Sequence, residues 1–108
     1  MDKLKPSQLL LLGASKVRHI RDAFHHIDRR HQVDAACAIG MMSVAKAGST
    51  DYEDCKKALT LLERELCGLF ITTHCARPQT VRAYVVYMND TLKLSSDEIA
   101  ERLEKCGY

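Results

Sequence analysis

Hydrophobic residues recur at intervals of three and four along most of the chain, and this spacing predicts helices. The most regular run follows Thr50 and Glu53, and consists of Tyr52, Cys55, Leu59, Leu62, Leu66 and Leu69. Thr50 and Glu53 have the spacing of a capping box, in which each side chain satisfies a free backbone N–H of the first helical turn. We therefore predict a helix that begins near residue 50 and buries one leucine-rich face.

The leucine positions of this helix have two interpretations, which the spacing alone leaves open. A seam of Leu59, Leu62 and Leu66 packs either into the core of its own chain or against a second copy. Two heptads are short for an independent coiled coil, which favours the core. The modest length of the chain nevertheless suggests incomplete burial in a monomer, so we predict a homodimer with these leucines at its interface.

Three further helices are expected before residue 50. Pro6 suits a first helical turn, and Gly13 ends or bends the short helix that it begins. The next is expected over residues 16–29, where one stripe recurs at intervals of three, four and three: Val17, Ile20, Phe24 and Ile27. Residues 33–47 are rich in alanine and other small residues, which allow close helix packing, and Gly48 follows. We interpret 33–47 as the central, most buried helix.

The second half of the chain is more ambiguous. Phe70–Thr73 has the composition of a strand without an obvious pairing partner. Residues 80–88 fit either a strand or a helix, and we predict a helix because a lone strand would leave its backbone unpaired. Ser95 and Glu98 form a second capping box, and Gly107 ends the helix that follows. The predicted fold is all-α, a compact bundle of about five helices forming one domain over residues 1–108.

Composition and cysteine usage narrow the class of protein. Hydrophobic residues make up 46% of the 108 residues, which is typical of a globular chain. The longest apolar run, Leu9–Leu12, is far too short to cross a membrane, and the first residues lack the pattern of a signal peptide. The five cysteines have no regular spacing, which predicts reduced thiols, with Cys37 and Cys55 buried. We therefore expect a cytoplasmic protein that does not engage a membrane.

Basic residues are concentrated in the first half of the chain. Residues 1–50 carry eight Lys/Arg and four Asp/Glu, giving +4, whereas residues 51–108 carry eight and ten, giving −2. On the helix expected over 16–29, the face opposite the apolar stripe carries Arg18, Arg21, His25 and Arg29. Guanidinium groups pair bidentately with carboxylates and phosphates, so this face predicts a partner-binding surface. An ordinary solvated helix face has the same composition.

The two function classes for this stripe are a protein-binding module and a nucleic-acid-associated regulator. The net charge of +2 is low, and the acidic second half would repel a duplex lying across the molecule. We therefore favour a non-enzymatic interaction protein with an acidic protein partner over one that binds nucleic acid.

Candidate chemistry elsewhere is sparse. Asp22 and His26 lie four residues apart, and Cys67 precedes His74 and Cys75, but none of these has the paired spacing of a zinc site. The chain has no glycine-flanked serine, phosphate-binding loop or dinucleotide motif. We therefore assign no catalytic residue, metal ligand or cofactor, and keep a cysteine- or metal-dependent enzyme as a remote alternative.

Two short blocks carry a resemblance. The segments 36–40 (Ala-Cys-Ala-Ile-Gly) and 85–90 (Val-Val-Tyr-Met-Asn-Asp), with the capped helix start at 95–100, resemble a family of small uncharacterised bacterial and phage proteins. Its members show a cysteine-alanine-leucine-glycine-alanine helix and a histidine-leucine-asparagine-aspartate turn. Here Tyr87 replaces the histidine, Leu94 replaces a tryptophan, and a cysteine pair before residue 80 is missing. The resemblance implies a bacterial or phage setting and no particular activity.

Overall fold

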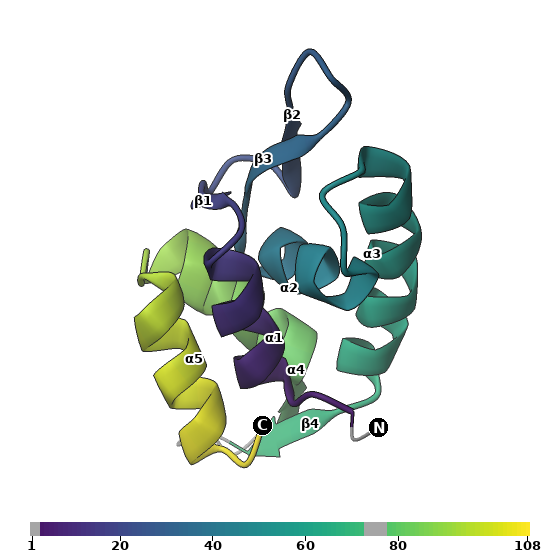
Figure 1. The fold of residues 1–108 in the computed structure, drawn as a ribbon. Helices are drawn as coiled ribbons and strands as arrows, with labels where there is room; N and C mark the ends of the chain where they lie inside the picture. Colours follow the sequence, from purple (N-terminus) through teal and green to yellow (C-terminus); the bar gives the residue numbers. More distant parts are fainter. Residues whose placement is uncertain (1–2, 73–77) are drawn as a thin grey trace.

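The computed structural model describes residues 3–72 and 78–108. Within these residues, α-helices and one turn of π-helix are combined with short strands in two sheets (Figure 1). The predicted all-α bundle is therefore wrong, and the chain is a small mixed α/β domain. Helices dominate, but the segment expected to carry the basic helix face belongs to a sheet.

Helix α2 (Ala38–Ala47) is the centre of the molecule, packed between α1 (Pro6–Ala14) and α3 (Tyr52–Cys67). Every residue from Ala38 to Val44 is buried, so the prediction of a central, most buried helix is confirmed for this part. Helix α5 (Ser96–Lys105) packs on α1 from the other side (Figure 1). Helix α4 (Val81–Val86) continues into the π-helix η1 (Tyr87–Thr91).

Two glycines allow this packing. A Cβ on Gly13 of α1 would lie 1.9 Å from the carbonyl oxygen of Met41 in α2. A Cβ on Gly40 of α2 would lie 1.8 Å from the carbonyl oxygen of Phe24. Both distances are far inside van der Waals contact, so the backbone of α2 approaches two other segments at positions where only glycine fits.

Residues 18–36 form a three-stranded sheet rather than helices. The strands β1 (Arg18–His19), β2 (His25–Ile27) and β3 (Val33–Ala36) lie in the order β1-β3-β2. Strand β1 is parallel to β3, and β2 is antiparallel to it, with a bulge between His26 and Ile27.

The helix predicted over 16–29 is therefore wrong, and the helix predicted from residue 33 begins only at Ala38. The apolar stripe does not form one buried face, because Val17 is buried whereas Phe24 is 39% exposed. The turn at residues 28–32 competes successfully with helix, since the Asp28 side chain accepts hydrogen bonds from two backbone N–H groups beyond it.

The strand-like segment that begins at Phe70 does have a pairing partner, in a second sheet. Strand β4 (Phe70–Thr72) pairs antiparallel with β5 (Pro78–Thr80), and the helix predicted after residue 80 follows directly as α4. Strand pairing and helix therefore both occur in the region that the sequence left ambiguous.

The helix ends show which local sequence signals correctly predicted where a helix begins or ends. The capping box of Ser95 and Glu98 is confirmed, and Gly48 and Gly107 both have the positive φ typical of residues that end helices. The start of α3 is also confirmed, but its cap is Asp51, which accepts a hydrogen bond from the Asp54 N–H. The predicted cap Thr50 instead donates its hydroxyl hydrogen to the Gln32 side chain at 2.7 Å.

The leucine seam of α3 lies largely inside its own chain. Leu62 and Leu66 are each 1% exposed and belong to the core, and Leu59 is half-buried against it. Leu62 and Leu66 are therefore not available to a second copy, which corrects the predicted interface and supports the core interpretation. A homodimer stays a prediction that would need another surface. In the part of the chain that the structure describes, no helix combines the length and hydrophobicity needed to cross a membrane.

Candidate functional site

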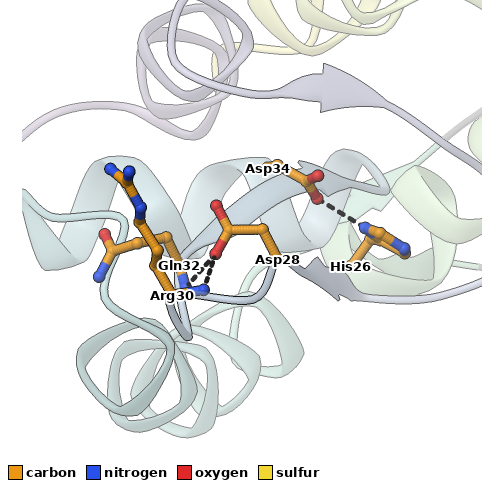
Figure 2. Close-up of polar contacts among 5 residues, drawn as sticks. All are labelled: His26, Asp28, Arg30, Gln32 and Asp34. Atoms are coloured by element: carbon orange, nitrogen blue, oxygen red, sulfur yellow. Dashed lines mark hydrogen bonds and ion pairs between the residues drawn. The ribbon is translucent and has the colours of Figure 1, made fainter.

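The basic segment forms a β-hairpin that extends beyond the helices at the end of the molecule where α3 begins (Figure 1). Its loop is held by Asp28, whose carboxylate accepts hydrogen bonds from the Arg30 N–H at 2.8 Å and the Gln32 N–H at 3.0 Å (Figure 2). His31 has a φ of 62°, so it is the left-handed residue that closes a three-residue hairpin loop. The loop backbone is thus defined by its own hydrogen bonds.

The base of the hairpin is fixed to the connection between α2 and α3. The Val33 N–H donates to the Thr50 carbonyl at 2.7 Å, and the Tyr52 N–H donates to the His31 carbonyl at 3.1 Å. The Tyr52 ring also meets the His31 ring edge to face, with centroids 5.2 Å apart. The hairpin therefore has a fixed orientation relative to the helices.

Three arginines are exposed on this hairpin and the strand beside it. Arg29 and Arg30 lie in the loop, and Arg18 lies in β1. None of the three forms an ion pair with a carboxylate of the described residues. We call Arg18, Arg29 and Arg30 the basic surface.

The other two residues of the predicted stripe have structural partners. Arg21 donates from Nη2 to the carbonyls of Lys93 and Leu94, at 3.0 and 3.1 Å, and so links the segment after β1 to the start of α5. His25 is half-buried, and its Nε2 lies 2.7 Å from the Ser43 hydroxyl oxygen. The single helical stripe of Arg18, Arg21, His25 and Arg29 therefore does not exist.

The hydrogen bonds around His25 indicate that its Nε2 carries a hydrogen. The Ser43 hydroxyl donates its hydrogen to the Gly40 carbonyl at 2.6 Å, so His25 Nε2 must donate to Ser43. Partial burial lowers the pKa of His25 below 6.5. On the exposed face of the hairpin, His26 donates to the Asp34 carboxylate at 2.6 Å, and this hydrogen bond lowers the pKa of Asp34 (Figure 2).

The stability of the protein should fall as the pH drops below 6.5. The unfolded chain binds a proton at His25 more readily than the folded chain does, so protonation favours unfolding. Urea unfolding at pH 7.5 and pH 5.5 should show this loss in the wild type and a smaller loss in His25→Gln. His31→Asn is the matched control, because asparagine tolerates the left-handed backbone at that position.

The lowered pKa of Asp34 does not obscure this window. The contribution of Asp34, whose pKa is lowered, is lost only as the pH falls below its ordinary value of 3.8. If His25→Gln kept the full loss between pH 7.5 and 5.5, another group would be its source.

A second polar cluster lies inside the molecule, around Asn89 in η1. Asn89 is 2% exposed, and its Oδ1 accepts hydrogen bonds from the Ala38 N–H at 3.1 Å and from His19 Nε2 at 2.6 Å. Its Nδ2 donates to the Asp90 carboxylate at 2.7 Å. Asn89 therefore joins the start of α2 to η1 and β1, which brings together the two sequence blocks at 36–40 and 85–90. The local sequence around Asn89 gives no sign of this role.

The two buried cysteines, Cys37 and Cys55, do not provide an activated nucleophile. Burial raises the pKa of the Cys37 thiol, and burial together with Asp54 and Asp51 raises that of Cys55 to about 11. Both thiols are buried, as predicted, and remain protonated at neutral pH. Cys67 and Cys106 are exposed and free, and Cys75 lies outside the described residues.

The candidate metal ligands within the described residues are not brought together. Across residues 3–72 and 78–108, no three histidine, cysteine or acidic side chains converge in a way that could hold a metal ion. Asp22 and His26 are therefore not joined by a third ligand in this part of the chain. His74 and Cys75 lie outside the described residues.

The features on which a function can rest are thus the basic surface and the region around Asn89. The first is exposed and positively charged, and the second joins α2, η1 and β1. No family model, no curated protein and no solved structure matches the chain.

Proposed function

We propose that the protein is a small non-enzymatic interaction module that binds an acidic surface of another protein through its basic surface, Arg18, Arg29 and Arg30. The observation that carries this proposal is a hairpin of fixed conformation, with β1 beside it, whose three exposed arginines form no ion pair in the described part of the chain. Arginines held in this way are available for carboxylates of a partner.

The rigidity of the hairpin favours binding. Ordering a flexible loop costs free energy on association, and the Asp28 and Thr50 hydrogen bonds have already ordered this one. Guanidinium groups form two parallel hydrogen bonds with a carboxylate, which adds geometric specificity to charge attraction. Exposed pairs contribute only about 0.2–1 kcal/mol each, so the partner must engage several of them together.

A protein partner is favoured over nucleic acid because the molecule as a whole carries little positive charge. The net charge is +2, and residues 51–108 carry −2, ten acidic residues against eight basic ones. Nucleic-acid binding would require a larger basic footprint to displace counterions from the phosphates.

The proposal of binding rather than catalysis rests on the thiols and on the polar clusters. Cys37 and Cys55 are protonated at neutral pH, since burial raises the pKa of each. Asn89 holds the fold together by accepting hydrogen bonds from His19 and from the Ala38 N–H of α2.

The charge-reversed variant Arg18→Glu/Arg29→Glu/Arg30→Glu should lose the partner while keeping the fold. Its three side chains are exposed, and the Arg30 backbone hydrogen bond to Asp28 does not depend on the side chain. Affinity capture from nuclease-treated bacterial lysate, quantified by mass spectrometry, should recover a protein with the wild type and at least about tenfold less of it with the variant.

The matched control is Lys56→Glu/Lys57→Glu/Arg64→Glu, which reverses three exposed charges on α3. It should capture the same protein as the wild type. The proposal fails if the hairpin variant retains every wild-type partner. It also fails if the only specific ligand is nucleic acid, whose affinity falls steeply with salt.

A further inference from the structure

A cavity of about 320 Å³ opens beside the start of α2, away from the hairpin loop. Its walls come from the segment after β1, from the start of α2 and from α4 with η1. Phe24, Ile39 and Val86 give it an apolar side, and Arg21, Asp22 and Asp90 give it charge. Cavities of this size with an apolar wall and a few polar groups are typical of small-molecule sites.

The charges that line the cavity are incompletely paired by the protein. Arg82, also in the wall, is neutralised by Glu63 at 3.2 Å. Arg21 is held by two neutral carbonyls, so its positive charge has no carboxylate partner among the described residues. In the same part of the chain, Asp22 has no hydrogen-bond or ion-pair partner, and Asp90 accepts only from the Asn89 amide.

The wall of the cavity is also locally unusual. Asn89 and Asp90 belong to η1, a π-helical turn, and such turns occur frequently at functional sites. The π-helical turn is fixed from behind by Asn89, which binds the Ala38 N–H and His19. Asp90 is thereby presented at the cavity by a rigid part of the fold.

We propose that this cavity binds a compact zwitterion with an apolar side chain, the chemical class of the apolar α-amino acids. The ammonium group of the ligand lies against Asp22 and Asp90, and its carboxylate pairs with the N–H groups that Arg21 does not use for Lys93 and Leu94. The side chain packs on the apolar wall. A simple cation would leave Arg21 unpaired, and a simple anion would meet two carboxylates, so a ligand of both charges fits best.

The test is an amide NMR titration of the wild-type protein with valine, leucine, methionine and phenylalanine. Leucine in particular should bind with a Kd of about 1 mM or tighter, the order expected for a ligand of this size. The shifted resonances should include Ile39 and Val86. Two analogues of leucine separate its charges: 3-methylbutylamine lacks the carboxylate, and 4-methylpentanoate lacks the ammonium group. Each should bind at least about fivefold more weakly than leucine.

Asp22→Asn and Asp90→Asn should each weaken amino-acid binding about fivefold, whereas Asp54→Asn on α3 should not. Both carboxylates of the site are exposed, so thermal unfolding should verify that the variants remain folded. The proposal is overturned if no amino acid shifts these resonances up to about 10 mM, well above the expected Kd. It is also overturned if either analogue binds as tightly as leucine. The variant of the basic surface, Arg18→Glu/Arg29→Glu/Arg30→Glu, should bind amino acids with the affinity of the wild type. This result would separate the cavity from the proposed protein-binding surface.

Discussion

Gly40→Ala is expected to destabilise the protein by about 3 kcal/mol or more, a large fraction of the about 5–15 kcal/mol by which small domains are ordinarily stable. The added Cβ would lie 1.8 Å from the Phe24 carbonyl oxygen and 2.8 Å from the Ala36 Cβ. Alanine is the better helix former by about 1 kcal/mol, but this gain is smaller than the cost of separating two backbone segments. Urea unfolding monitored by circular dichroism measures the difference.

Gly68→Ala is the matched control, because it adds the same methyl group at the end of α3 where there is room. Its nearest neighbours would be the carbonyl oxygens of Glu65 and Arg64, at 3.5 and 3.7 Å, and its φ of −91° suits any residue. Its stability should stay within about 1 kcal/mol of the wild type. Equal stability of the two variants would show that the close approach of α2 to Phe24 is not required.

Asn89→Ala is expected to cost about 3 kcal/mol of unfolding free energy. Removing the amide leaves the buried Ala38 N–H without its acceptor and removes the partner of His19 Nε2, and each buried unsatisfied group costs about 1–3 kcal/mol. The cavity left by the side chain adds to this cost. Urea unfolding at pH 7.5 measures the loss.

Asp90→Asn is the control for Asn89→Ala, because Asp90 is exposed and accepts only one hydrogen bond, from the Asn89 amide. It should cost less than about 1 kcal/mol. If Asn89→Ala were no worse than Asp90→Asn, the link between α2, η1 and β1 would contribute little to stability.

Local sequence signals correctly predicted the helices whose ends are set by residues within the helix or directly next to it. Ser95 and Glu98 start α5 with a capping box, Gly48 ends α2, and the leucine spacing defines α3. These features depend on residues within one or two turns of one another, which the sequence shows directly. The one-residue error at the start of α3 arises because Thr50 binds Gln32, a contact 18 residues away.

The sheet and the two candidate functional regions depend on contacts that are distant in sequence. The intervals of Val17, Ile20, Phe24 and Ile27 satisfy a helical pattern, yet β1 pairs with β3 across seventeen residues, Arg18 opposite Ala35. The one local sign of a hairpin was Asp28 followed by a polar turn, which indicates an Asx-type turn. The role of Asn89 could not be predicted, since it accepts a hydrogen bond from the N–H of Ala38, a residue 51 positions earlier.

In the hairpin loop, the residues that fix the backbone differ from those whose side chains are exposed. Asp28 and His31 set the backbone, whereas the side chains at positions 29 and 30 are exposed and contribute no hydrogen bond to it. On the proposed binding surface, mutations at positions 29 and 30 are therefore expected to alter recognition at little cost in folding. Related chains could diverge in partner choice at these two positions while retaining an identical core, and the same loop would accept a short grafted recognition sequence in the laboratory.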